Sequence, residues 1–230
     1  MGTIISCNNL TKTYKTSKLF YALDDVSMNI NKGELLVIVG VSGSGKSTLI
    51  NILGGMDKCS SGSIYFKNDN ITKYSEKKLT QYRKKNIGFI YQAFNLINEL
   101  TVYENVLLTS DSKANIDEIL KKVGLFDKKN LYPKELSGGE QQRVAIARAL
   151  SKKCDILFCD EPTGSLDSEN SKKILLLLES LSRNDNKTVV IVTHNNDIIK
   201  IADRVYTMKN GKIIDERKND KPLSVKDMEF

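Results

Sequence analysis

The chain has 230 residues, of which 40% are hydrophobic and 27% charged, and its formal net charge is +7. This composition suits one domain with a substantial core and excludes wholesale disorder. The single histidine, His194, excludes any multi-histidine metal site. A basic chain can bind nucleic acid or an anionic membrane surface, so both classes of partner stay open on charge alone.

The cysteines and the apolar runs predict neither a zinc site nor a membrane span. The four cysteines form no C-x-x-C pair and match no zinc-site spacing. The longest apolar runs, 35–39 and 174–178, are far shorter than the ~20 residues that cross a bilayer. We therefore expect a cytoplasmic chain, for which any membrane role needs a partner polypeptide.

The first part of the chain is mainly typical of strands. Residues 26–30 alternate between apolar and polar, which predicts a strand with one buried face. Residues 35–39 form a continuous apolar run, which is typical of a strand buried on both faces. A helix is expected over 48–53, followed by short strands at 64–66 and 87–91.

The middle of the chain is helical in pattern, and strands return after it. From about residue 93 to residue 153 we expect helices, including 102–106, 116–123 and 139–152. Buried strands are predicted at 156–159 and 188–192, with a helix over 168–182 between them. Asn210-Gly211 predicts a hairpin between strands 205–208 and 212–214. These elements indicate an α/β domain with a parallel sheet, some antiparallel strands and a helical insertion.

The segment Gly40-Val41-Ser42-Gly43-Ser44-Gly45-Lys46-Ser47 fits the phosphate-binding pattern G-x-x-x-x-G-K-[ST]. Its backbone N–H groups and the helix N-terminus that follows would bind phosphate oxygens. Lys46 would reach the β- and γ-phosphates, and the Ser47 hydroxyl would ligate Mg²⁺. A plain turn is the alternative, which the matching strand and helix disfavour. The candidate residues are Gly40, Ser42, Gly43, Ser44, Gly45, Lys46, Ser47 and Thr48.

Two carboxylates, Asp160 and Glu161, stand at the end of the buried strand 156–159. Ligands of parallel sheets bind at the carboxyl ends of strands, so both side chains are expected beside the phosphate-binding loop. There Asp160 would hold Mg²⁺, directly or through water, and Glu161 would take a proton from an attacking water. The alternative is an exposed acidic turn before Pro162.

His194 and Gln92 also follow predicted strands directly. His194 would hydrogen-bond a γ-phosphate oxygen or the attacking water, although a lone histidine is otherwise most often structural. Gln92 would sense Mg²⁺ or water at the γ-phosphate. Both residues are therefore candidates for the same site.

The segment Leu136-Ser137-Gly138-Gly139-Glu140 begins a second helix that is suited to an anion. Ser137 is a good N-cap, and the two glycines let an anion approach the helix end closely. This helix belongs to the helical insertion, so one nucleotide cannot obviously contact both helix ends within one chain. We expect a head-to-tail pair of chains, in which each Ser-Gly-Gly faces the γ-phosphate bound by the other chain.

In their order along the chain these motifs resemble the ATPase subunit of ATP-binding-cassette (ABC) transporters, up to about residue 216. The resemblance implies a P-loop NTPase fold with a RecA-like parallel-sheet core, an antiparallel β subdomain and an inserted α-helical subdomain. The core and β subdomain would comprise 1–92 and 154–216, and the helical subdomain 93–153. Residues 217–230 would form a peripheral tail.

The resemblance also implies roles for individual residues. Tyr14 would stack on adenine, Asp167 would lie with Ser165 at the dimer interface, and ATP would be contacted in trans. The trans contacts would come from Ser137, Gly138 and Gly139. The implied catalytic residues are Glu161, His194, Lys46 and Gln92. The implied metal ligands are Ser47, Gln92 and Asp160, and Asp160 and Asp167 count among the ATP-binding residues. Glu140 replaces the glutamine of many family members, without excluding activity.

A finer resemblance points to one branch of the family. Residues 51–57, 94–96 and 160–167 are similar to macrolide-export, lipoprotein-release, antimicrobial-peptide-resistance and cell-division ATPases. The branch implies ATP and Mg²⁺ as cofactors, an ATP-dependent homodimer and a separately encoded membrane permease at the inner face of the cell membrane. The expected process is export, resistance, or extraction of lipoproteins or lipids.

Two alternatives stay open beside this function. One is a regulatory ABC ATPase that controls a cell-envelope process, and the other is an ABC ATPase acting on nucleic acid or ribosomes. ABC ATPases that act on nucleic acid or ribosomes usually have two cassettes in one chain or a long coiled coil, whereas this sequence has one cassette. Between residues 67 and 85, seven basic and two acidic residues give a local charge of +5. The basic balance is therefore local, and no nucleic acid is expected as partner.

Overall fold

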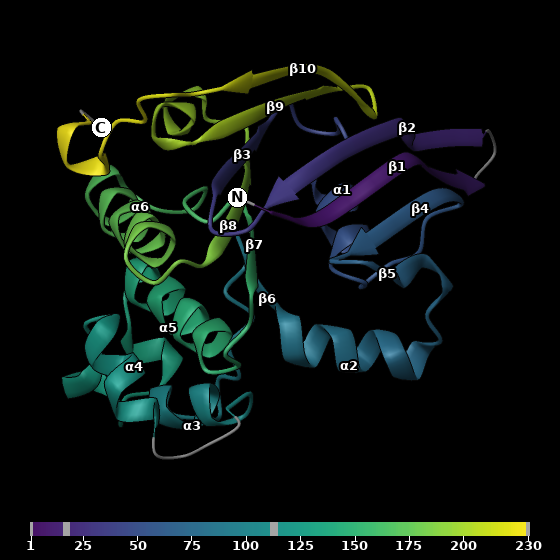
Figure 1. Cartoon of the computed structure of the whole chain (residues 1–230). Coiled ribbons are helices and arrows are strands. Elements are labelled where there is room, and N and C mark those ends of the chain that lie inside the picture. Colours follow the sequence, from purple (N-terminus) through teal and green to yellow (C-terminus); the bar gives the residue numbers. More distant parts are fainter. Residues whose placement is uncertain (1, 16–18, 111–114, 229–230) are drawn as a thin grey trace.

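The computed structural model describes residues 2–15, 19–110 and 115–228, and it contains two sheets with helices packed around them (Figure 1). The larger sheet has six strands in the order β10-β9-β3-β8-β7-β6. Five of these strands run parallel, and β10 pairs antiparallel with β9 at one edge. The strand bounds are β3 Leu35–Val39, β6 Ile87–Tyr91, β7 Ile156–Asp160, β8 Thr188–Thr193, β9 Arg204–Lys209 and β10 Lys212–Lys218.

The smaller sheet is antiparallel, with strand order β2-β1-β4-β5. Its strands are β1 Thr3–Lys15, β2 Leu19–Asn31, β4 Ser61–Phe66 and β5 Asp69–Asn70. The sequence pattern predicted only part of β2 and missed β1. Asn9 and Asp25 have positive φ near shifts in the register of this pair, so bulges interrupt the alternation on which the prediction depended.

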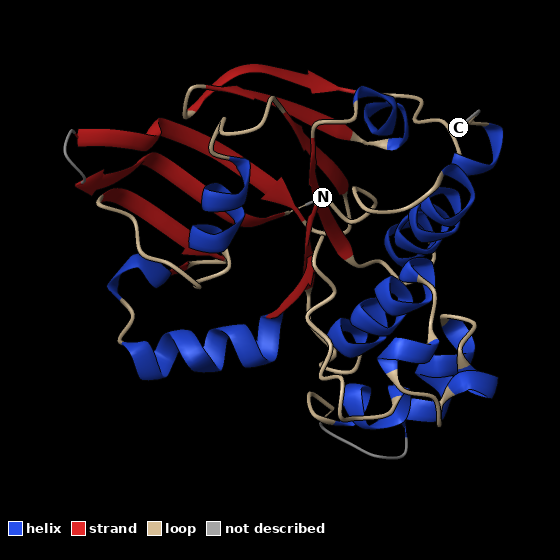
Figure 2. Cartoon of the chain, turned by 180° about the vertical axis from the view of Figure 1, so that it is seen from behind, coloured by secondary structure: helices blue, strands red, loops and turns tan. Residues whose placement is uncertain are grey.

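The helices fall into two groups that Figure 2 shows on different sides of the central sheet. Helices α3, α4 and α5 lie together, away from the antiparallel sheet, as expected for an inserted helical subdomain. Residues 93–101 are not helical, contrary to the prediction. Helix α2 lies in the basic segment and was not predicted, because only Leu79 and Tyr82 are buried in it. The helix bounds are α1 Lys46–Leu53, α2 Glu76–Asn86, α3 Val102–Leu107, α4 Ile116–Lys122, α5 Gly138–Leu150 and α6 Ser168–Arg183.

The central sheet separates two apolar clusters. Alternate residues of β3 belong to different clusters, with Leu35 and Val37 on one face and Leu36 and Ile38 on the other. Every residue of β3 and β8 is buried. This double burial explains why these strands are continuous apolar runs rather than alternating ones. All four cysteines are free, and burial raises the pKa of the Cys154 thiol to about 11, as expected for a packing residue.

The described part of the C-terminal segment packs on helix α6. Strand β10 continues to Lys218, beyond the point where an irregular tail was expected. Val225 and Met228 are buried in the same cluster as the inner face of α6. The Glu179 carboxylate accepts a hydrogen bond from the Val225 N–H at 3.2 Å. Within the described ranges, none of the helices combines the length and apolar character that a membrane crossing requires.

Candidate nucleotide site

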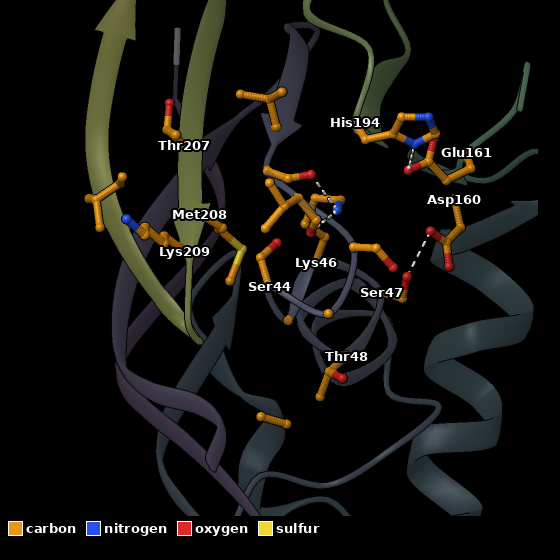
Figure 3. A pocket seen from close by; sticks show the side chains of 18 of the residues that line it. Ser44, Lys46, Ser47, Thr48, Asp160, Glu161, His194, Thr207, Met208 and Lys209 are labelled. Atoms are coloured by element: carbon orange, nitrogen blue, oxygen red, sulfur yellow. Dashed lines mark hydrogen bonds and ion pairs between the residues drawn. The ribbon is translucent and has the colours of Figure 1, made fainter. Parts of the chain in front are cut away.

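A cleft of about 1120 Å³ opens at the carboxyl edge of the parallel sheet (Figure 3). Strands β3, β6, β7 and β8 all end there, because they run in the same direction. The cleft therefore collects residues that follow four different strands, and Tyr14 of β1 also lines it. The predicted site residues that line it are Tyr14, Gly40, Ser42, Gly43, Ser44, Gly45, Lys46, Ser47, Thr48, Gln92, Asp160, Glu161 and His194.

The loop between β3 and α1 needs glycine at two positions for steric reasons. A Cβ at Gly40 would lie 2.3 Å from the Met208 carbonyl oxygen of β9. Gly45 has a φ of 101°, and a Cβ there would lie 2.4 Å from the Ala22 carbonyl oxygen of β2. Gly45 is also the N-cap of α1 and offers no side-chain acceptor to the first N–H groups. Those N–H groups are thus left to face a ligand.

Lys46 points back over this loop. Its ammonium donates hydrogen bonds to the carbonyl oxygens of Gly40 at 2.8 Å and Val41 at 3.0 Å. Burial lowers the pKa of Lys46, while the Glu161 and Asp160 carboxylates act in the opposite direction. Ser44 Oγ is buried and has no hydrogen-bond partner among the described residues. An unpartnered buried hydroxyl is costly, so a ligand that accepts from it would stabilise the loop.

Oxygen atoms of Ser47 and Asp160 meet beside the loop. The Ser47 hydroxyl donates to Asp160 Oδ1 at 2.9 Å. Burial raises the pKa of Asp160, with a further increase from Glu161 and an opposing effect of the Ser47 hydrogen bond. A hydroxyl and a carboxylate are ligands that Mg²⁺ prefers, so this pair fits that cation. Gln92 lines the same cleft, but its Nε2 donates to Ser165 Oγ at 3.3 Å.

The Glu161 carboxylate is held at both oxygens. His194 Nδ1 lies 2.9 Å from Oε1, and the Thr193 hydroxyl donates to Oε2 at 3.1 Å. The Glu161 N–H also donates to the Val192 carbonyl at 2.9 Å. Glu161 itself has a φ of 48°, which is unusual for a residue other than glycine. The sequence reasoning missed Thr193, although its place directly before His194 at the strand end was a usable signal.

Tyr14 lines the cleft from β1 and is held by contacts with Asp57 and Lys12. Its hydroxyl donates to Asp57 Oδ2 at 3.1 Å, and Lys12 Nζ binds Asp57 Oδ1 at 2.8 Å. Lys12 Nζ also lies 5.0 Å from the centre of the Tyr14 ring. Phe20 is the cross-strand partner of Tyr14 and is 54% exposed. Cleft residues that the sequence reasoning did not name as site residues are Phe20, Ala22, Val39, Val41, Asn196, Thr207, Met208, Lys209 and Ile214.

The remaining predicted residues lie outside this cleft, at the N-termini of α5 and α6. Ser137 caps α5, accepting from the Glu140 N–H at 3.4 Å while Glu140 accepts from the Ser137 N–H at 2.9 Å. Glu140 completes this capping box just as the more usual glutamine would. A Cβ at Gly139 would lie 2.4 Å from Asn170 Oδ1 of α6. Gly138, between Ser137 and Gly139, is the first residue of α5.

Asp167 is the N-cap of α6 and does not line the cleft. It accepts a hydrogen bond from the Asn170 N–H at 2.8 Å, and this bond is the main cause of its lowered pKa. The helix ends that carry Ser137 and Asp167 pack against each other through Gly139 and Asn170. The structure thus brings the predicted residues together in two groups rather than one.

Comparison with known proteins agrees with this architecture. The ABC transporter family profile matches residues 23–164. The lipoprotein-releasing system ATP-binding protein LolD of Francisella tularensis subsp. tularensis (strain FSC 198) is 42% identical over 220 residues, which cover 91% of this chain and 95% of that protein. The methionine import ATP-binding protein MetN 2 of Bacillus cereus (strain ATCC 10987 / NRS 248) is 42% identical over 94% of this chain and 66% of its own length.

A solved structure extends the likeness to three dimensions. The dimeric post-hydrolysis state of the ATP-binding cassette MJ0796, bound to ADP and Pi, has a TM-score of 0.85 and 40% identity. The match covers 93% of this chain and 98% of that one. The predicted P-loop fold and the predicted ATPase activity are confirmed by these likenesses. The chain belongs to the ABC transporter family, as an ATP-binding and ATP-hydrolysing subunit.

Proposed function

We propose that two copies of the chain close head to tail over two ATP molecules, and that this closure moves a separate membrane protein. One observation carries the proposal: Ser137 and Gly139 lie at a helix end outside the cleft that contains Lys46. A γ-phosphate bound at Lys46 can then meet this second helix end only from another chain. The related cassette MJ0796 is dimeric in a post-hydrolysis state bound to ADP and Pi, which supports the pairing of two chains.

Within this dimer each residue of the cleft has a chemical task. Glu161, oriented by Thr193 and His194, takes the proton of the attacking water. Lys46 and the N–H groups of the loop stabilise the charge that develops on the γ-phosphate. Ser47 and Asp160 would hold Mg²⁺, with Gln92 at the rim, and the cation would neutralise phosphate charge when bound.

A mixing experiment tests whether the sites are shared between chains. Lys46→Ala removes the ammonium group from the cleft, and Ser137→Arg blocks the N-terminus of α5. Each variant alone is therefore expected to be inactive. In a heterodimer of the two, one composite site is intact. Random pairing should therefore restore up to about one quarter of the wild-type ATPase rate, measured as phosphate release.

A second mixture is the control. Lys46→Ala and Glu161→Gln both damage the cleft of their own chain, so a heterodimer of these two variants has no intact site and should stay inactive. If the first mixture shows no more activity than its separate components, the sites are not shared and the head-to-tail proposal is wrong.

The membrane process proposed for this subunit is extraction or export at the cell envelope, from the inner face of the membrane. The match spans 95% of the lipoprotein-releasing relative, whereas it spans 66% of the methionine import relative. Co-purification with a membrane protein encoded beside this chain, together with ATPase stimulation by that protein, would support the proposal. A soluble or nucleic-acid partner that alone stimulates the ATPase would contradict it.

Tyr14 is the residue expected to hold the adenine ring. Tyr14→Ala should weaken ATP binding by about 1–3 kcal/mol, the range found for aromatic stacking platforms. Tyr21→Ala is the matched control, because Tyr21 is a similarly exposed aromatic residue on β2 that does not line the cleft. Titration with a fluorescent ATP analogue measures both, and equal affinity in the two variants would remove Tyr14 from the nucleotide site.

A further inference from the structure

Gln142, in helix α5, forms hydrogen bonds to two backbone segments that carry cleft residues. Its side chain is only 1% exposed. Its Nε2 donates to the Tyr91 carbonyl at 3.3 Å and to the Pro162 carbonyl at 2.9 Å. Tyr91 precedes Gln92, and Pro162 follows Glu161. A single amide group therefore links the backbone beside two residues of the cleft.

The Pro162 bond matters because Glu161 has a strained backbone. A φ of 48° persists in a glutamate only where its surroundings determine it. On the N-terminal side, the Glu161 N–H is bound by Val192 in β8. On the C-terminal side, the Gly164 N–H donates to the Glu161 carbonyl at 3.1 Å, and Gln142 donates to the Pro162 carbonyl that follows it. Loss of that bond frees the peptide after Pro162, so the Glu161 carboxylate can move relative to the phosphate-binding loop.

The Tyr91 bond belongs to a wider attachment of α5 to the segment after β6. Arg148, further along α5, donates to the carbonyl oxygens of Phe94 at 3.1 Å and Asn95 at 2.5 Å. Gln142 holds the start of this segment and Arg148 holds its middle. Gln92 lies between the two attachments, so its position depends on α5.

The polar nature of Gln142 is not needed for packing. Its Oε1 is buried and has no hydrogen-bond partner among the described residues. An unpartnered buried oxygen is costly, and leucine or methionine would fill the same space without that cost. The amide is therefore explained by its two donated hydrogen bonds and not by its volume.

We propose that Gln142 is a positioning residue for ATP hydrolysis, which sets Gln92 and Glu161 relative to each other from helix α5. The inference depends on the proposed role of Glu161 as the base. Helix α5 begins at the helix end that would meet a partner's ATP. A movement of α5 on that contact would therefore be transmitted through Gln142 to the backbone beside Gln92 and Glu161.

The test replaces Gln142 with methionine, which keeps the length of the side chain and removes both donors. We expect kcat to fall about ten- to a hundredfold, as for small displacements of catalytic groups. The KM for ATP and the dissociation constant of ATP should stay within about twofold, because the nucleotide contacts are untouched. Gln141→Met is the matched control, since the Gln141 side chain donates a hydrogen bond to the Leu136 carbonyl of its own segment at 3.2 Å.

Thermal unfolding of each variant separates positioning from stability. A cooperatively folded Gln142→Met chain with wild-type kcat, or an equal loss in Gln141→Met, would overturn the inference. If the methionine variant does not fold, Gln142→Asn keeps an amide that is one methylene too short to reach both carbonyls, and the same kcat loss is expected. These outcomes leave the proposed function intact, because that function is tested separately by mixing the Lys46→Ala and Ser137→Arg variants.

Discussion

Lys46→Ala is expected to abolish ATP hydrolysis, with a loss of at least about a hundredfold in kcat. The positively charged Lys46 ammonium group lies against the phosphate-binding loop, where it donates hydrogen bonds to the Gly40 and Val41 carbonyls. Alanine removes the charge that would stabilise the γ-phosphate, and nothing in the loop replaces it. Phosphate release by the purified chain measures the effect.

Lys77→Ala is the control for the change in charge. Lys77 is exposed on α2, far from the residues that line the cleft, so this variant should hydrolyse ATP at the wild-type rate. Circular dichroism should show both variants folded, because the hydrogen bonds that the Lys46 side chain donates go to carbonyls of its own loop, Gly40 and Val41. Turnover near the wild-type rate in Lys46→Ala would refute the assignment of the site.

Glu161→Gln should keep ATP binding and stop hydrolysis, with kcat reduced about 10²- to 10⁴-fold. Glutamine has nearly the same shape but cannot accept the proton of the attacking water. Because the nucleotide then persists, the closed dimer should accumulate. Gel filtration should show a dimer with ATP and a monomer without it.

Glu118→Gln on α4 removes the same charge at an exposed position away from the cleft, and it should neither stop hydrolysis nor trap a dimer. The dimer of Glu161→Gln should also dissociate when Lys46 is replaced in the same chain. A Glu161→Gln chain that binds ATP and stays monomeric would contradict closure driven by ATP.

The order of the motifs was sufficient to predict the cleft. Each polar residue stands directly after an apolar strand, and parallel strands bring their carboxyl ends to one edge of the sheet. Gln92, Asp160 and His194 therefore line one cleft, although more than 100 residues separate the first from the last. The phosphate-binding loop could be predicted without any assumption about how the strands pair, because its glycines and Lys46 lie within one short segment.

Other features depend on contacts that no local pattern encodes. Strand β1 was missed because the irregularity at Asn9 breaks the alternation of its apolar residues, as Asp25 does in the paired strand β2. Phe20 and Ile214 reach the cleft only because β2 and β10 pass over it. Their exposure has no periodic signature, so the sequence could not place them at the site.

The sequence by itself determined the phosphate-binding loop, the acidic strand end and the single histidine beyond a strand, since each depends on neighbours along the chain. Only the tertiary structure decided that Thr193 and His194 bind the Glu161 carboxylate and that Gln142 holds the backbone beside Glu161 and Gln92. These are hydrogen bonds between residues 20 to 51 positions apart in the sequence. Such bonds form only after the sheet and helix α5 have packed, because packing alone brings the two partners within bonding distance.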